Sequence, residues 1–230
     1  MNVKQYLAAG LLILSAGITD LHATNPKENR NNMEKLTLTK EWDKTFPKSD
    51  KVDHSKVTFV NRYGITLAAD MYKPKGAIGK LPAIAVCGPF GAVKEQAAGL
   101  YAQAMAERGF LTIAFDPSFT GESGGTPRYM TSPDINTEDF SAAVDFLVTN
   151  PEVDPEKVGI IGICGWGGIA INAAATDPRI KATLASTMYD MSRVNANGYF
   201  DAEDSAEVRR NKREAMNACL LYTSPSPRDR

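Results

Sequence analysis

The chain has 230 residues, of which 43% are hydrophobic and 23% charged, and its formal net charge is -1. This length favours one globular domain with enough apolar residues for a sizeable core. A nearly neutral chain gives no reason to expect nucleic acid or an anionic membrane surface as a partner. The three cysteines are too few for a disulfide scaffold.

The N-terminal segment 1–23 has the pattern of a secretory signal peptide. Lys4 precedes the uncharged apolar run LAAGLLILSAGI, and TDLHAT then offers a polar exit with a cleavage site after Ala23. The run is too short for a stable membrane anchor, and an uncleaved anchor is the alternative. We therefore expect export to a periplasm or secretion. The polar segment 24–53 is expected to be a linker and edge segment.

Strand and helix patterns alternate after this segment. The continuous apolar runs PAIAVCG, LTIAFD and VGIIGIC are typical of strands that are buried on both faces. The predicted strands are 57–61, 66–72, 82–88, 111–116, 158–164 and 180–187, with helices over 94–110, 136–150 and 167–176. This alternation predicts an α/β fold, a mostly parallel sheet with helices on both faces. Ligands of such sheets bind at the carboxyl ends of the strands, where the loops after Cys87, Asp116 and Cys164 would lie.

The stretch GIIGICGWGG, residues 159–168, has the pattern of a strand that enters a sharp turn and then a helix. Such a turn can present a nucleophilic side chain to a substrate, and its glycines permit close packing and positive φ angles. The cysteine at its centre, Cys164, is the candidate nucleophile.

Five motifs in order carry a resemblance to a known family: VTFVNRYGITLAADMYKP, PAIAVCGPFGAVKEQ, AFDPSFTGESGGTPR, SPDINTEDFSAAVDFL and VGIIGICGWGG. Their order resembles the α/β-hydrolase superfamily, and within it the branch of dienelactone-hydrolase-like bacterial esterases. The resemblance spans Val57 to Tyr189. It implies the α/β-hydrolase fold and hydrolysis of an ester, lactone or similar acyl bond in a small-molecule substrate.

The resemblance also assigns the parts of a site. Cys164 would attack the carbonyl, and the backbone N–H of Gly165 would hold the oxyanion. The second donor would be Phe90, because the neighbouring Pro89 has no N–H. The remaining residues of the two turns would shape the pocket: Gly88, Gly91, Gly162, Trp166, Gly167 and Gly168.

The register of the turn leaves alternatives open. With Cys164 as nucleophile, Gly162 fits the small position before it, but Trp166 occupies the small position after it. Counting back from Gly168 shifts the frame by two and puts Trp166 at the nucleophile position, which would make the chain a non-catalytic binding protein. Cys164 as a buried structural cysteine, or a peptidase or acyltransferase of the same fold, are further alternatives.

The second cysteine at the carboxyl edge gives one more alternative. The resemblance makes the strands that end in Cys87 and Cys164 neighbours in the sheet. A disulfide between them is therefore considered, and it would block the nucleophile or act as a redox latch.

The partners of the nucleophile are missing from the sequence. A cysteine nucleophile needs a histidine base oriented by a carboxylate, and the resemblance puts both after two further strands. Both histidines, His22 and His54, precede Cys164, and Asp190 lies one strand too early for the acid. We therefore expect a C-terminally truncated hydrolase domain over 54–218, inactive as it stands.

Two expectations complete the sequence analysis. The ending CLLYTSPSPRDR, residues 219–230, resembles translated adapter sequence and is expected to be non-native. We expect no metal and no organic cofactor, because there is no metal-ligand cluster and GESGG does not match the dinucleotide motif G-x-G-x-x-G.

Overall fold

The computed structural model describes residues 34–188 and 190–223, all within one compact unit. The predicted signal peptide and the last seven residues of the predicted non-native tail lie outside the described residues. None of the helices in the described part of the chain is both long enough and apolar enough to cross a membrane.

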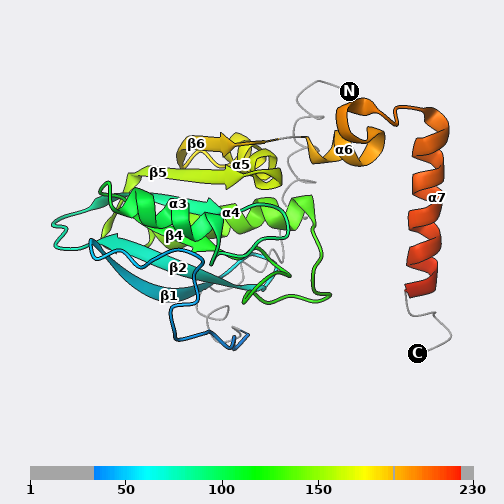
Figure 1. Ribbon diagram of the computed structural model, residues 1–230. Helices are drawn as coiled ribbons and strands as arrows, with labels where there is room; N and C mark the ends of the chain where they lie inside the picture. Colours follow the sequence, from blue (N-terminus) through cyan, green and yellow to red (C-terminus); the bar gives the residue numbers. More distant parts are fainter. Residues whose placement is uncertain (1–33, 189, 224–230) are drawn as a thin grey trace, which may run out of the picture. The chain divides into compact units, whose positions relative to one another are not determined.

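Six strands of the described chain form one sheet, shown in Figure 1 from β1 (cyan) at one edge to β6 (orange) at the other, in the order β1-β2-β4-β3-β5-β6. The strands are β1 Val52–Val60, β2 Thr66–Pro74, β3 Leu81–Cys87, β4 Leu111–Phe115, β5 Val153–Ile163 and β6 Ile180–Ser186. β2 pairs antiparallel with β1 and β4, and the other pairs are parallel. The predicted mostly parallel sheet is confirmed.

Helices cover both faces of this sheet. They are α3 Ala97–Ala106, α4 Pro133–Val148 and α5 Gly165–Thr176, followed after β6 by α6 Met191–Asn197, the 3-10 turn η1 Tyr199–Asp201 and α7 Ala206–Thr223. One core cluster joins the sheet to α4 and α5, and a second joins its other face to α3. Along β3, Ala83, Ala85 and Cys87 belong to the first cluster, whereas Ile84 and Val86 belong to the second. This division explains why the strand is apolar at every position.

Several boundaries differ from the prediction; β5, for example, begins at Val153 rather than at residue 158, and α3 spans only Ala97–Ala106. β1 begins at Val52 rather than at residue 57, because its exposed residues alternate with buried ones and hide the apolar signal. The segment before it is more than a linker, since Phe46 is buried in the α3 core and Trp42 packs against that core. Helix α4 begins at Pro133 rather than at residue 136, because the Ser132 hydroxyl accepts the N–H of Ile135 and caps the helix.

Candidate active site

The turn between β5 and α5 is built on a strained cysteine. Cys164 has φ 59° and ψ -126°, a region that side chains other than glycine rarely occupy and that is found at functional sites. Hydrogen bonds fix both sides of its backbone: its N–H donates to the carbonyl of Ser186 at 2.8 Å, and its carbonyl accepts the N–H of Gly167 at 3.0 Å. Cys164 itself is partly exposed.

Close packing around this turn requires glycine two residues before the cysteine. A Cβ on Gly162 would lie 2.2 Å from the carbonyl oxygen of Trp166 and 2.7 Å from the Cβ of Ala170. The first turn of α5 therefore rests directly on the backbone of β5, which places Cys164 at the point where the chain reverses.

Trp166 does not occupy the turn. It lies within α5, is 3% exposed, and its ring centroid is 6.3 Å from that of Phe140 in the core. The structure therefore places Cys164, and not Trp166, at the turn itself. The close contact after the turn falls on Gly167, where a Cβ would lie 2.9 Å from the Cβ of Met188.

The two predicted oxyanion donors are neighbours in space. Phe90 lies in the loop between β3 and α3, and a Cβ built on Gly165 would lie 3.5 Å from the Cβ of Phe90. Among the hydrogen bonds between described residues, none uses the backbone N–H of Phe90 or Gly165 as donor. The N–H of Gly165 is free because the first residues of a helix have no intrahelical acceptor. These two N–H groups can therefore donate hydrogen bonds to a negatively charged oxygen.

The other glycines of these turns have separate roles. Gly91 has φ 78°, which favours glycine, and a Cβ on Gly88 would lie 3.1 Å from the Cβ of Ala98 at the start of α3. Gly168 has no described atom within 4 Å of the position of its Cβ.

A cavity of about 810 Å³ opens beside Phe90 and Gly165. Its surface is mostly apolar. Its walls include Pro133 and Thr137 on α4, Gly168 and Ile169 on α5, and Met188 and Met191 around the start of α6. A space of this size is typical of small-molecule sites.

The disulfide considered as an alternative is not formed, since Cys87 and Cys164 are both free. Cys87 is fully buried in the core beneath α4 and α5, and its Sγ lies 3.7 Å from the carbonyl oxygen of Phe115. Cys164 packs against the core on the α3 side. The two side chains thus belong to opposite faces of the sheet, and a bridge would need the backbone to move. Burial also raises the pKa of Cys87 well above its usual range, which leaves it an unreactive thiol.

No histidine in the described part of the chain can serve Cys164. His54 lies in β1, with its Nε2 2.8 Å from Oδ1 of Asp70. Three strands separate β1 from β5 in the sheet, a distance of about 19 Å at the usual strand spacing. Asp190 caps α6, where its Oδ1 accepts the N–H of Arg193 at 3.0 Å. His22 lies outside the described residues.

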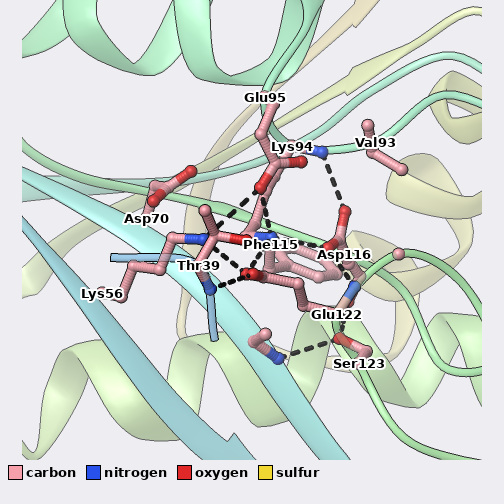
Figure 2. A network of polar contacts seen from close by, with 12 residues as sticks. Thr39, Lys56, Asp70, Val93, Lys94, Glu95, Phe115, Asp116, Glu122 and Ser123 are labelled. Carbon is pink, nitrogen blue, oxygen red and sulfur yellow. Dashed lines mark hydrogen bonds and ion pairs between the residues drawn. The ribbon is translucent and has the colours of Figure 1, made fainter. Parts of the chain in front are cut away.

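A buried polar network lies next to the loop that carries Phe90. Its centre is Lys94, whose side chain is fully buried and whose Nζ lies 2.8 Å from both Asp116 and Glu122 and 2.5 Å from Glu95. Figure 2 shows these carboxylates converging on the amines of Lys94 and Lys56. The backbone N–H of Lys94 also donates to Asp116, at 2.8 Å. The network therefore ties the loop after β3 to the loop after β4.

This network has no recognisable signal in the amino-acid sequence. Lys94 and Glu95 stand in the polar run VKEQ, which is typical of an exposed helix start, yet α3 begins only at Ala97. Ser123, in the same region, has a structural role, since its hydroxyl donates to the carbonyl of Asp116 at 2.7 Å and accepts the N–H of Ala68.

The charges of the network shift its pKa values. Burial alone would raise the pKa of Glu122, but hydrogen bonds from Lys56 and Lys94 outweigh it and hold the pKa at about 2. Burial would lower the pKa of Lys94, yet Asp116 and its neighbours raise it. Burial, with repulsion from Asp116, raises the pKa of Glu95 despite its hydrogen bond from Lys94.

Three carboxylates of this region have the spacing of a metal site. One oxygen each from Asp43, Glu95 and Glu122 lie within 4.8 Å of one another. The ammonium of Lys56 lies 3.8, 3.8 and 2.6 Å from these three groups, and Lys94 pairs with two of them. The lysines thus supply the positive charge that would otherwise have to come from a metal ion.

Glu122 makes stability depend on pH. Its lowered pKa means that its stabilising contribution is complete above its usual pKa of 4.5 and is lost as pH falls toward about 2. We expect Glu122→Gln to be less stable than the wild type at pH 7, and the difference in melting temperature to shrink between pH 4.5 and 2. Thermal unfolding followed by circular dichroism measures this difference. Glu156→Gln, on an exposed side chain, is the control; a Glu122→Gln difference that stays constant with pH would contradict the assignment.

Comparison with known proteins places this architecture in a family. Residues 63–217 match the family model described as X-Pro dipeptidyl-peptidase (S15 family). The uncharacterized protein PA2218 of Pseudomonas aeruginosa is 63% identical over 197 residues, which cover 85% of this chain and 53% of PA2218. Its crystal structure aligns with a TM-score of 0.79 and 64% identity, covering 80% of this chain and 58% of that one.

Two further likenesses are more distant. Thiohydrolase aneE of Aspergillus aculeatus is 34% identical over 137 residues, 60% of this chain and 42% of aneE. The α/β hydrolase GrgF from Penicillium sp. sh18 is 22% identical with a TM-score of 0.56, covering 75% of this chain and 68% of GrgF, and it supports the fold alone.

The matches cover only part of the length of each relative. The chain spans about half the length of the curated relatives it matches. The predicted dienelactone-hydrolase-like branch stays a prediction. The family model covers most of the described sheet and its helices, and the chain therefore belongs to the S15 family of α/β hydrolases.

Proposed function

We propose that this chain carries the nucleophile and the oxyanion donors of a hydrolase of ester, lactone or thioester bonds, with Cys164 as the nucleophile. The observation that carries the proposal is the backbone of Cys164, held at φ 59° between β5 and α5. Strain of this kind persists where the surrounding structure imposes it, and it presents the side chain at the carboxyl edge of the sheet. Phe90 and Gly165, the predicted oxyanion donors, are neighbours in space, and Gly165 directly follows Cys164.

The chemistry follows from these groups. The Cys164 thiolate attacks the carbonyl carbon, and the electron pair of the C=O bond moves onto oxygen, where the N–H groups of Phe90 and Gly165 stabilise it. The carbonyl re-forms as the bond to the leaving alkoxide or thiolate breaks, and the leaving group takes up a proton. Water then attacks the thioester on Cys164, which releases a carboxylic acid and restores the thiol.

The proton transfers need a base that the described residues do not offer. His54 is held by Asp70 in β1, and Cys87 is buried and unreactive. In the proposal, a histidine and a carboxylate from the length that the relatives have beyond the matched segment complete the site. The name of the 34% identical relative, a thiohydrolase, supports an acyl bond as the target.

Acyl trapping tests the nucleophile without requiring turnover. The protein is treated with 4-nitrophenyl acetate, and peptide mass mapping locates the acetyl group. We expect one acetyl group on Cys164, formed faster than on N-acetylcysteine at the same pH, because the two N–H groups stabilise the oxyanion.

Two cysteine variants serve as controls. Cys164→Ala should abolish the fast reaction, and Cys87→Ala should leave it unchanged. Acetylation of Cys164 no faster than that of N-acetylcysteine, or fast labelling that persists in Cys164→Ala, would refute the proposal.

A further inference from the structure

We infer that the cavity beside Phe90 and Gly165 binds an apolar acyl group and discriminates against a substrate with a positively charged N-terminus. This inference rests on the proposed function and adds the class of substrate. It begins from position: Phe90 and Gly165, the two oxyanion donors, are themselves part of the cavity wall. An acyl group whose carbonyl oxygen bonds to these N–H groups therefore starts at the mouth of this space.

The size of the cavity favours a long acyl group. At about 810 Å³ it would be mostly water around a bound acetyl group. Each methylene group that replaces this water is stabilised, because burial of apolar surface is favourable. The largest side chains of the wall, such as Ile169, Met188 and Met191, are apolar.

Four of the polar side chains of the wall are already paired within the protein, namely Thr137, Asn172, Asp190 and Ser192. The hydroxyl of Thr137 donates to the carbonyl of Pro133 at 2.7 Å and accepts the amide N–H of Asn172 at 3.0 Å. The hydroxyl of Ser192 donates to Asp190 at 2.6 Å. Groups that are paired in this way leave no strong requirement for a polar substrate at this wall.

Among the described residues that line the cavity, only Asp190 is charged, and it caps helix α6. Asp190 accepts the hydroxyl of Ser192 and the N–H of Arg193 at the start of α6. A peptidase that reads the N-terminus of its substrate must balance a desolvated ammonium group. A single exposed carboxylate that already accepts two hydrogen bonds is poorly suited to that task, so the cavity favours an uncharged acyl chain.

Gly168 provides a substitution that changes the cavity alone. It lines the cavity, lies within α5, and no described atom lies within 4 Å of its Cβ position. The Cβ of a leucine at this position would meet no described atom, and we expect its side chain to fill part of the cavity. Gly168→Ala adds one methyl group and is the matched control.

The experiment measures the rate at which the 4-nitrophenyl esters of acetate, hexanoate and 6-aminohexanoate acylate Cys164. The rate for each ester is divided by the rate at which the same ester acylates N-acetylcysteine, which gives a normalised rate. We expect the normalised rate to rise about fourfold for each methylene group from acetate to hexanoate, the equivalent of about 0.8 kcal/mol per group. The 6-aminohexanoate ester, with nearly the same length but a charged end, should react more slowly than the hexanoate ester. Gly168→Leu should lower the ratio of the hexanoate rate to the acetate rate by about tenfold or more, whereas Gly168→Ala should keep the preference.

The outcomes separate this inference from the proposed function. Equal normalised rates for all three esters, or faster reaction of the 6-aminohexanoate ester, would overturn the apolar pocket while Cys164 stands as nucleophile. Failure of every ester to acylate Cys164 would instead overturn the proposed function. If the Gly168→Leu variant unfolds below the assay temperature, Ile171→Ser tests the same wall, because Ile171 is 46% exposed and lines the cavity. This variant should show a weaker preference for the hexanoate ester. An undiminished preference would contradict the inference.

Discussion

Replacing Lys94 with methionine is expected to lower the free energy of unfolding by about 3–5 kcal/mol. The substitution keeps most of the volume of the side chain but removes its charge. Asp116, which is fully buried, would then lose the ammonium that lies 2.8 Å from its Oδ2. An uncompensated buried charge is strongly destabilising, because the carboxylate can neither return to water nor find another cation.

Chemical denaturation measures this effect, and a second lysine gives the control. Lys157 pairs with Asp154 on the surface at 3.1 Å, with a side chain that is 68% exposed. Lys157→Met should cost no more than about 1 kcal/mol, since surface ion pairs contribute little. Equal decreases in the free energy of unfolding for the two variants would show that the buried network does not stabilise the loops after β3 and β4.

Replacing Gly162 with alanine is expected to cost about 3 kcal/mol or more, the upper end for overpacking. The added Cβ would lie 2.2 Å from the carbonyl oxygen of Trp166. This clash is with the backbone, which cannot change rotamer to relieve it as a flexible side chain could. The first turn of α5 must move, and the N–H of Gly165 moves with it. A displacement of about 1 Å in such a group can reduce a rate about a hundredfold, so acylation of Cys164 should also slow.

Gly168→Ala is the control for this substitution. Gly168 lies in the same helix with open space around its Cβ position, and alanine there should stabilise the protein by about 0.5–1 kcal/mol. Denaturant unfolding and the rate of acylation by 4-nitrophenyl acetate are measured for both variants. A Gly162→Ala protein with wild-type stability and a wild-type acylation rate would show that the turn between β5 and α5 is not packed as described.

The fold was predictable because its strongest signals are local. β3, β4 and the last part of β5, from Val158 on, are almost entirely buried, so each appears in the sequence as a largely apolar run. The start of β1 was not predictable, because exposed residues alternate there with buried or half-buried ones and charged residues interrupt the apolar pattern. The turn at Cys164 was recognisable from glycine spacing, but sequence could not decide between Cys164 and Trp166. That choice depends on the backbone angle of Cys164 and on the burial of Trp166 against Phe140.

The polar network and the cavity were beyond sequence reasoning for a different reason. Lys56, Lys94, Asp116 and Glu122 come from separate segments, and each taken alone has the character of a surface residue. Their burial arises only when the sheet brings those segments together. The cavity likewise depends on how α4, α5 and α6 meet, which no single element encodes.

The central claim is that Cys164 acts as a nucleophile whose oxyanion is held by Phe90 and Gly165. A crystal structure of the protein after reaction with 4-nitrophenyl hexanoate tests it most directly. We expect a thioester on Cys164 whose carbonyl oxygen lies about 2.7–3.1 Å from the backbone nitrogens of Phe90 and Gly165, with the acyl chain in the cavity. An unmodified Cys164, or a thioester whose oxygen points away from both N–H groups, would contradict it.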